Sequence, residues 1–122
     1  MRTSSPKRTL LLAVAVAAAF AASTSTSAAS PQSVTGTVGP GFTIVLTKSG
    51  HKVTKLKAGA YIVKVSDKSA IHNFHVTGKG VNKKTVVGKK QKATWKVKFK
   101  KGTYRFRCDS HPTIMKGSFK AS

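Results

Sequence analysis

The chain has almost no acidic side chains. Its 122 residues include no glutamate and only two aspartates, Asp67 and Asp109, against 23 lysines and arginines. Catalysis by a pair of carboxylates would need these two residues to meet, and the sequence has no nucleophile motif of the form G-x-S-x-G. We therefore expect that the protein is not an enzyme.

The sequence also lacks an apolar run long enough to span a membrane as a helix. Its longest run, residues 10–22, follows a basic start and precedes the small-residue stretch "STSTSAAS". This order is typical of a cleaved signal peptide. We predict a signal peptide at residues 1–29, with Ala29 the last residue removed. The remaining domain, residues 30–122, would have no transmembrane segment and would be exported to a periplasm, a cell envelope or the medium.

A single cysteine, Cys108, leaves no partner for an internal disulfide. Outside the cytoplasm an exposed thiolate is open to oxidation, so Cys108 is a buried inert thiol, an intermolecular link or a metal ligand. The segment "CDSHPTIM" also contains His111 and Met115, the only methionine apart from the initiator. A thiol, an imidazole and a thioether within eight residues favour the metal ligand.

Alternating apolar and polar residues are abundant in the predicted domain. In "TYRFRC", residues 103–108, Tyr104, Phe106 and Cys108 share one face and two arginines the other. Turn signals rich in Gly and Lys recur about every 8 to 12 residues, which is typical of a sandwich or barrel. We predict an all-β Greek-key sandwich of about eight strands. The other segments with strand patterns are residues 34–38, 42–47, 52–56, 60–67, 72–77, 85–87, 94–100 and 117–121.

The stretch "HNFHV" at residues 72–76 supplies a second candidate ligand. A period of two places His72 on the inward face with Phe74 and Val76, and His75 on the outward face. His72 would begin one inward row and Cys108 would end another, so the two side chains can meet at one end of a sandwich. His75 is the rival ligand, disfavoured by its outward direction, and the fourth histidine, His51, is expected to be a surface residue in a turn.

Two imidazoles, one thiolate and a weak thioether form a soft trigonal donor set with a distant axial ligand. This is the blue-copper arrangement, although Zn²⁺ also accepts one Cys and two His. On intrinsic affinity Cu²⁺ outcompetes Zn²⁺ at such a site. The sequence therefore predicts one copper ion.

The pair "HN" at 72 and 73, followed by "TYRFRCDSH" and a methionine near the C-terminus, resembles the cupredoxins, the plastocyanin-like small blue copper proteins. The resemblance implies a cupredoxin-like fold for residues 30–122 and one type 1 copper. In this family one upstream His and a Cys, His and Met from one loop hold the metal. The implied metal ligands are His72, Cys108, His111 and Met115.

The resemblance also implies roles for residues around the metal. Asn73 would tie the two ligand loops together, and His111 would be the electron port within an apolar patch that includes Pro112 and Ile114. Apart from the resemblance, Asp109 is expected either to brace the ligand loop by a hydrogen bond or to be a solvated turn carboxylate. The loop spacing is C-x2-H-x3-M, whereas plastocyanins have one residue more before the methionine and amicyanins one fewer. The axial ligand is therefore less firmly implied than the trigonal set.

The formal net charge is +21, and loss of a signal peptide with three basic residues and no acid would leave +18. Such a charge predicts an acidic redox partner or loose binding to anionic envelope polymers. We expect no specific binding of nucleic acid, because the aromatic and basic residues of each strand alternate between opposite faces. We expect a monomer.

Three functions agree with these features. The first is a one-electron carrier with a type 1 copper site. The second is an envelope protein that holds or delivers copper without a dedicated electron-transfer role. The third is a metal-free cupredoxin-like module that binds anionic surfaces.

Overall fold

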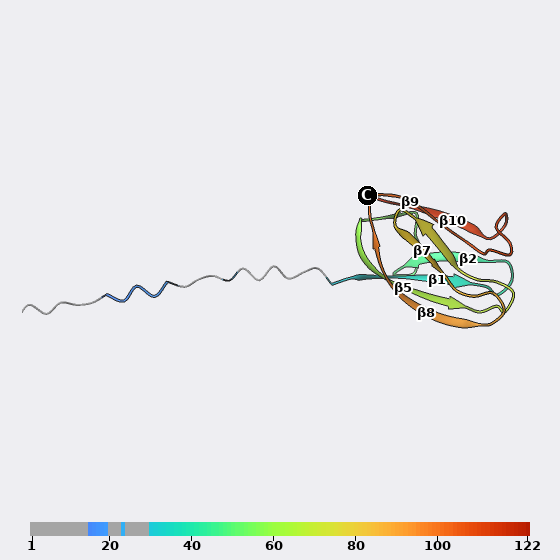
Figure 1. Cartoon of the computed structure of the whole chain (residues 1–122), viewed down its shortest axis with the longest axis horizontal. Helices are drawn as coiled ribbons and strands as arrows, with labels where there is room; N and C mark the ends of the chain where they lie inside the picture. Colours follow the sequence, from blue (N-terminus) through green and yellow to red (C-terminus); the bar gives the residue numbers. More distant parts are fainter. Residues whose placement is uncertain (1–14, 20–22, 24–29) are drawn as a thin grey trace, which may run out of the picture.

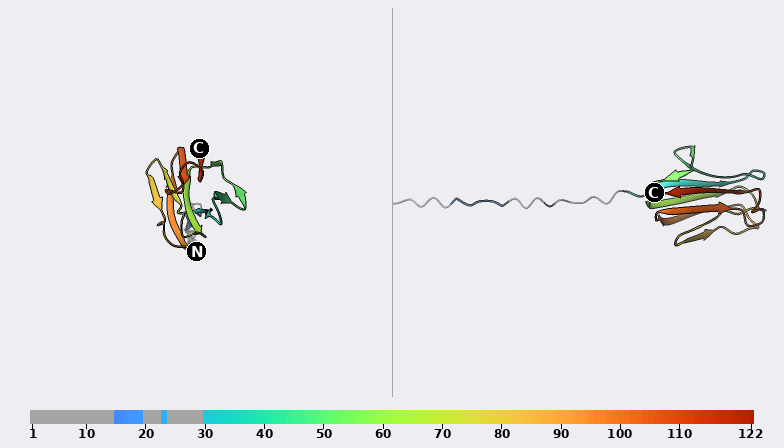
Figure 2. Two further views of the ribbon diagram at one scale, coloured as in Figure 1. Left: turned by 90° about the vertical axis from the view of Figure 1, so that its right-hand side faces the viewer. Right: turned by 90° about the horizontal axis from the view of Figure 1, so that it is seen from above.

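The computed structural model describes residues 15–19, 23 and 30–122. Two β-sheets face each other, with no helix among the described residues (Figures 1 and 2). In this part of the chain no helix is therefore long and apolar enough to cross a membrane. Most of the predicted signal peptide lies outside the described residues, so its boundary remains a prediction.

Each sheet has five strands. In spatial order the first sheet contains β3 (His51–Lys52), β2 (Ile44–Lys48), β1 (Gln32–Val38), β5 (Gly59–Asp67) and β8 (Gln91–Phe99). The second contains β4 (Lys55–Leu56), β10 (Lys116–Ala121), β9 (Gly102–Arg107), β6 (His75–Gly78) and β7 (Val81–Lys84). Neighbouring strands are antiparallel, except that β1 is parallel to β5 and β4 to β10. The predicted all-β sandwich is confirmed.

The structure has ten strands where about eight were predicted, and one reason is that the predicted strand at residues 52–56 is two. Its first part pairs with β2 in the first sheet and its second part with β10 in the second. Between them the N–H of Val53 donates to the Leu46 carbonyl at 2.8 Å. Thr54 accepts a hydrogen bond from the N–H of Lys120 at 3.0 Å, so the chain changes sheets within two residues.

Two other predicted strand boundaries are wrong. Residues 85–87 form no strand, and β6 begins at His75 instead of residue 72. The reason is a local pairing: the Phe74 N–H donates to Thr85 Oγ1 at 2.9 Å, and the Thr85 N–H donates to the Phe74 carbonyl at 3.0 Å. The side-chain hydroxyl of Thr85 thus accepts the hydrogen bond of the Phe74 N–H in place of a backbone carbonyl of a neighbouring strand. The sequence analysis also missed β7, an edge strand of which only Val81 is buried.

The core forms from the inward rows of both sheets. Tyr104, Phe106 and Cys108 are buried as predicted, and the Phe106 ring stacks on Phe74 with centroids 5.5 Å apart. The Phe74 ring crosses the sandwich to Gly36 of β1, where a Cβ atom would lie only 2.8 Å from the ring. A glycine at this position therefore leaves room for the aromatic ring beneath the site.

Two copies of one local motif brace the opposite end of the sandwich. β5 and β9 both start at the glycine of a K-x-G-x-Y sequence, with Gly59 and Gly102 each at φ +153°. The Tyr61 hydroxyl donates to the carbonyl of residue 57 at 2.6 Å, and the Tyr104 hydroxyl to that of residue 100 at 2.8 Å. Each tyrosine thus fixes the turn before its own strand, much like the tyrosine corner of other sandwiches.

The loop at residues 108–115, between β9 and β10, lies at one end of the sandwich (Figure 1). The start of β1 and the C-terminus lie at the other end, as a second direction of view also shows (Figure 2). The end that carries the candidate ligands is therefore remote from the point where the chain enters the domain.

Candidate metal centre

Three predicted ligands converge at this end of the sandwich. Cys108 directly follows β9 and continues its inward row, while His72 precedes β6, the neighbouring strand of the same sheet. His111 lies in the turn after Cys108. Together they form a cluster with the ligating atoms of a metal site, in which His72 and Cys108 are buried and His111 is half-buried.

The donor atoms form an isosceles triangle. The Nδ1 atoms of His72 and His111 are 3.1 Å apart, and the Cys108 Sγ is 3.7 Å from each. A point in the plane at equal distance from all three lies about 2 Å from each, which is the length of a bond between a transition metal and imidazole nitrogen. The two imidazoles and the thiol thus fit a copper ion in both donor type and spacing.

The ligand loop is held in shape by its own backbone. The N–H of His111 donates to the Cys108 carbonyl at 3.2 Å. The N–H of Cys108 donates to the Met115 carbonyl at 3.0 Å. The N–H of Met115 donates to the His111 carbonyl at 2.9 Å. Met115 is fully buried at the closing point of this loop. Its burial suits a weak axial ligand, and its ligation of a metal remains a prediction.

Asn73 connects the two ligand segments, as the resemblance implied. Its Oδ1 accepts a hydrogen bond from the backbone N–H of Asp109 at 2.7 Å. Its Nδ2 donates to Asp109 Oδ2 at 2.8 Å and to the Thr85 carbonyl at 3.1 Å. The side chain is 2% exposed, so these three bonds are shielded from water. One buried amide thereby fixes the residue after His72 against the residue after Cys108.

Asp109 braces the ligand loop, which decides between its two predicted roles. Its Oδ1 lies 2.8 Å from His75 Nδ1 and accepts a hydrogen bond from Arg107 Nε at 3.1 Å. Burial by itself raises the pKa of this carboxyl, but the hydrogen bonds from His75, Asn73 and Arg107 and the charge of His75 outweigh it and lower the pKa to about 2. The carboxylate is therefore ionised at neutral pH.

The remaining histidines lie outside the donor triangle. His75, the rival ligand, has both ring nitrogens beside oxygen atoms, Asp109 Oδ1 at 2.8 Å and Asn82 Oδ1 at 2.6 Å. His51 is exposed on β3. The choice of His72 over His75 by strand parity agrees with the observed cluster, although residue 72 itself precedes the strand.

Phe42 is a residue of the site that the sequence analysis missed. The apolar pattern predicts a strand from residue 42, but Phe42 lies in the turn before β2, where its ring packs edge-on against both imidazoles. The centroid distances are 5.3 Å to His72 and 5.1 Å to His111. The glycines around the proline in "GPGF" were the signal for this turn.

The loops at this end expose apolar side chains. Phe42 is 58% exposed, Ile71 beside His72 is 58% exposed, and Ile114 in the ligand loop is 63% exposed. Val86 and Val87 are also exposed, and their loop is tied to this end because the N–H of Gly88 donates to the carbonyl of residue 70 at 2.8 Å. Of these apolar groups, the Phe42 ring packs against the half-buried His111, and Ile114 donates its N–H to the His111 carbonyl at 3.3 Å.

Asp67, the other aspartate, is buried at the end of β5. Its Oδ1 accepts a hydrogen bond from the Ser69 N–H at 3.0 Å, while its Oδ2 has no partner among the described residues. Burial raises the pKa of this carboxyl, against smaller opposing effects of the Ser69 bond and the His72 charge. No hydrogen bond or ion pair joins the two aspartates within the described part of the chain; Asp109 is bound instead to His75 and Arg107.

Similar folds occur among solved structures. Reduced rusticyanin has a TM-score of 0.57 at 18% identity, covering 74% of this chain and 78% of its own. A second rusticyanin structure has a TM-score of 0.58 at 16% identity, covering 74% and 76%. Rusticyanin from Thiobacillus ferrooxidans has a TM-score of 0.50 at 19% identity, with coverage of 74% and 76%. At these identities the likeness is one of fold.

Among curated proteins, none matches this chain in sequence. A family model described as a cupredoxin-like domain matches residues 10–119, which is most of the chain. The match covers every strand that contributes to the candidate site. With its fold and a His-Cys-His cluster that resembles a blue copper site, this chain belongs to the cupredoxin-like family.

Proposed function

We propose that this chain is an exported type 1 copper protein that carries single electrons. The observation that carries the proposal is the triangle of His72, Cys108 and His111 donor atoms, closed toward the core and half-open toward an apolar surface. Solved structures of similar fold include a protein described as the copper protein rusticyanin. The proposed copper ligands are these three residues and Met115 as the axial ligand.

Copper bound at this triangle would supply a one-electron couple between Cu(II) and Cu(I). The chain's own contribution is to keep the donors in place in both states. Cys108 and His72 are buried at 0% and 1% exposure, so water does not compete for them. The Asn73 hydrogen bonds and the closed backbone of the ligand loop restrict movement of the donors. Little rearrangement favours fast electron transfer.

The surface around His111 supports a role as an electron port. His111 is half-buried. The exposed Phe42 ring packs against it, and exposed Ile114 lies in the same loop. Apolar contact at this end excludes water from an interface, while the high positive charge of the domain attracts an acidic partner. We propose such a redox partner, with weak attraction to anionic envelope polymers as a further effect that salt screens.

Copper binding is tested by adding Cu(II) to the full chain and recording its visible spectrum. We expect an intense thiolate-to-copper band that disappears in Cys108→Ala and His72→Ala. His51→Ala is the matched control, because this histidine is exposed on β3. The proposal is wrong if the band is missing from the unaltered chain, or if both ligand variants keep it.

Electron transfer is tested separately from copper binding. A carrier shows reversible one-electron voltammetry of the copper-loaded chain and keeps its copper through repeated cycles. A copper-delivery protein instead loses Cu(I) to a competing chelator on reduction. Rapid loss of the metal on the first reduction would reject the electron-carrier proposal in favour of delivery.

A further inference from the structure

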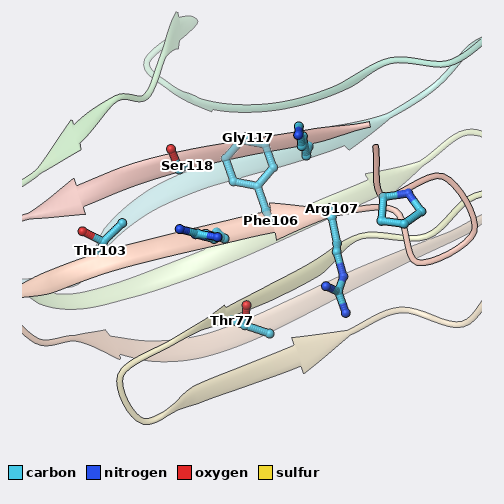
Figure 3. Close-up of a pocket in the computed structure, with 9 residues that line it drawn as sticks. Thr77, Thr103, Phe106, Arg107, Gly117 and Ser118 are labelled. Atoms are coloured by element: carbon cyan, nitrogen blue, oxygen red, sulfur yellow. The ribbon is translucent and has the colours of Figure 1, made fainter. Parts of the chain in front are cut away.

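A hollow on the outer face of the second sheet lies beside the ligand loop and belongs to no function described so far. Its volume is ≈ 580 Å³, and it crosses β6, β9 and β10 (Figure 3). Cationic and hydroxyl side chains line it, with Pro112 of the ligand loop at its rim and Phe106 and Gly117 completing it. Its polar lining residues are Thr77, Thr103, Arg105, Arg107, Lys116 and Ser118.

The cations in this hollow are arranged by the strand register. Arg105 lies between Thr77 of β6 and Ser118 of β10, and Arg107 lies directly opposite Lys116. Opposite residues of antiparallel strands have Cβ atoms about 5 Å apart. Because Tyr104 and Phe106 of β9 are buried and the residues between and after them are exposed, both arginines project from the outer face. Three positive groups are therefore neighbours on this face, and hydroxyl residues flank Arg105 on both sides.

These charges have little compensation from the protein. Arg107 pairs with Asp109 through Nε, and neither Arg105 nor Lys116 forms an ion pair within the described part of the chain. Arg105 and Arg107 are also the only arginines of residues 30–122, where all other basic residues apart from histidines are lysines. Guanidinium groups bind oxyanions through two parallel hydrogen bonds, which lysine does not.

A second basic hollow, between β7 and β8, provides a comparison. It is lined by Gly80, two valines and five lysines and has no hydroxyl side chain or arginine. It therefore offers point charges without geometric selectivity. Its five lysines are Lys79, Lys83, Lys96, Lys98 and Lys100.

We propose that the hollow formed by Arg105, Arg107 and Lys116 is a binding site for a phosphate group. A phosphate monoester carries a charge of about −1.5 to −2 and three strong acceptor oxygens. Three cations and three hydroxyls provide more donors than one carboxylate can accept, and they match a tetrahedral dianion better. The site does not depend on copper, so this inference stands apart from the proposed electron carrier.

The experiment is an NMR titration of the ¹⁵N-labelled full chain, without added metal, at constant ionic strength set with chloride. Inorganic phosphate is the first probe, and glycerol 3-phosphate is the second. We expect saturable amide shifts concentrated at Thr77, Arg105, Lys116 and Ser118. Binding of both probes identifies an esterified phosphate as an acceptable ligand, and binding of inorganic phosphate alone restricts the site to the free ion.

Matched charge variants separate a site from general attraction. Arg105→Gln and Lys116→Gln should each weaken phosphate binding about tenfold, the effect of losing a charge-assisted hydrogen bond. Lys96→Gln and Lys98→Gln remove the same charge from the other hollow and should change affinity less than about twofold. Arg107 is left intact because it also holds Asp109. The proposal would be overturned if all four variants weakened phosphate binding equally, or if the amide shifts were spread over both sheets. It would also be overturned if the shifts did not saturate beyond the effect of chloride alone.

Discussion

The side chain of Asn73 is hydrogen-bonded to both the backbone and the side chain of Asp109, 36 residues away in sequence. Each of these two residues directly follows a candidate ligand. The bonds are 2.7 and 2.8 Å long and belong to an amide that is 2% exposed. The relative position of His72 and Cys108 thus depends on one buried amide as well as on the sheet.

Replacement of Asn73 by alanine should therefore destabilise the metal-free fold. It removes three hydrogen bonds and leaves the N–H of Asp109 and the carbonyl of Thr85 without these partners. We expect a loss of about 2–4 kcal/mol in the free energy of unfolding. Urea denaturation of the full chain measures it. Gln32→Ala, which removes an exposed amide at the start of β1, is the control, and equal losses in the two variants would contradict the role given to Asn73.

The close approach of Phe74 to Gly36 predicts a second effect. A methyl group at position 36 would lie 2.8 Å from the ring of Phe74, which is 0% exposed and stacked on Phe106. Gly36→Ala should therefore cost about 1–3 kcal/mol through overpacking. Combining it with Phe74→Leu should recover part of this loss, since the smaller side chain leaves room for the methyl group. Thermal or urea unfolding of the two single variants and the double variant gives the coupling energy, and strict additivity would show that the contact is unimportant.

Much of the fold and most of the candidate site follow from a period of two. Alternation correctly predicted the inward direction of Tyr104, Phe106 and Cys108, because a strand buried on one face has few other solutions. It also placed His72 inward. Alternation failed where side chains replace backbone partners, as at Phe74 and Thr85. These bonds join segments 11 residues apart, and no local pattern encodes them.

Phe42 shows a different limit of sequence reasoning. An aromatic residue within an apolar stretch predicts burial in a strand, yet Phe42 is 58% exposed over two histidines. Its position results from the turn before β2, where Gly41 has φ +72° and the Gly39 N–H donates to the Thr43 carbonyl at 2.8 Å. Which loop faces the site depends on how the sheets are stacked, and this is a property of the whole chain.

The paired tyrosines at the remote end predict similar, independent effects on stability. Tyr61→Phe and Tyr104→Phe each remove a hydroxyl that donates to a carbonyl four residues earlier. Each variant should lose about 1 kcal/mol in the free energy of unfolding. Because Cys108 and His111 lie at the other end of the sandwich, copper binding should be unchanged. Unfolding curves and copper titrations of the full chain check both statements, and a weakened copper site would show that the two ends are coupled.

The ionisation of Asp109 predicts a dependence of stability on pH. Its pKa is about 2 in the folded chain and 3.8 in the reference state, so the unfolded chain binds more protons between these values. The carboxylate therefore stabilises the fold above about pH 4, and this contribution is lost as the pH falls toward 2. The shift corresponds to at most about 2 kcal/mol. Because the side chain is 30% exposed, we expect about 1–2 kcal/mol after solvent screening.

The nearly isosteric variant Asp109→Asn isolates this effect. Asp67 contributes with the opposite sign and at higher pH, since burial raises its pKa above the reference value of 3.8 and its protonation therefore favours the folded chain. Comparing the unaltered chain with Asp109→Asn at each pH removes the Asp67 contribution from the difference. Urea unfolding of the metal-free chains between pH 2 and 6 should give a difference that grows through pH 2–4 and is constant above about pH 5. A difference that stays flat throughout would mean that His75, Asn73 and Arg107 do not hold the carboxylate in its ionised form.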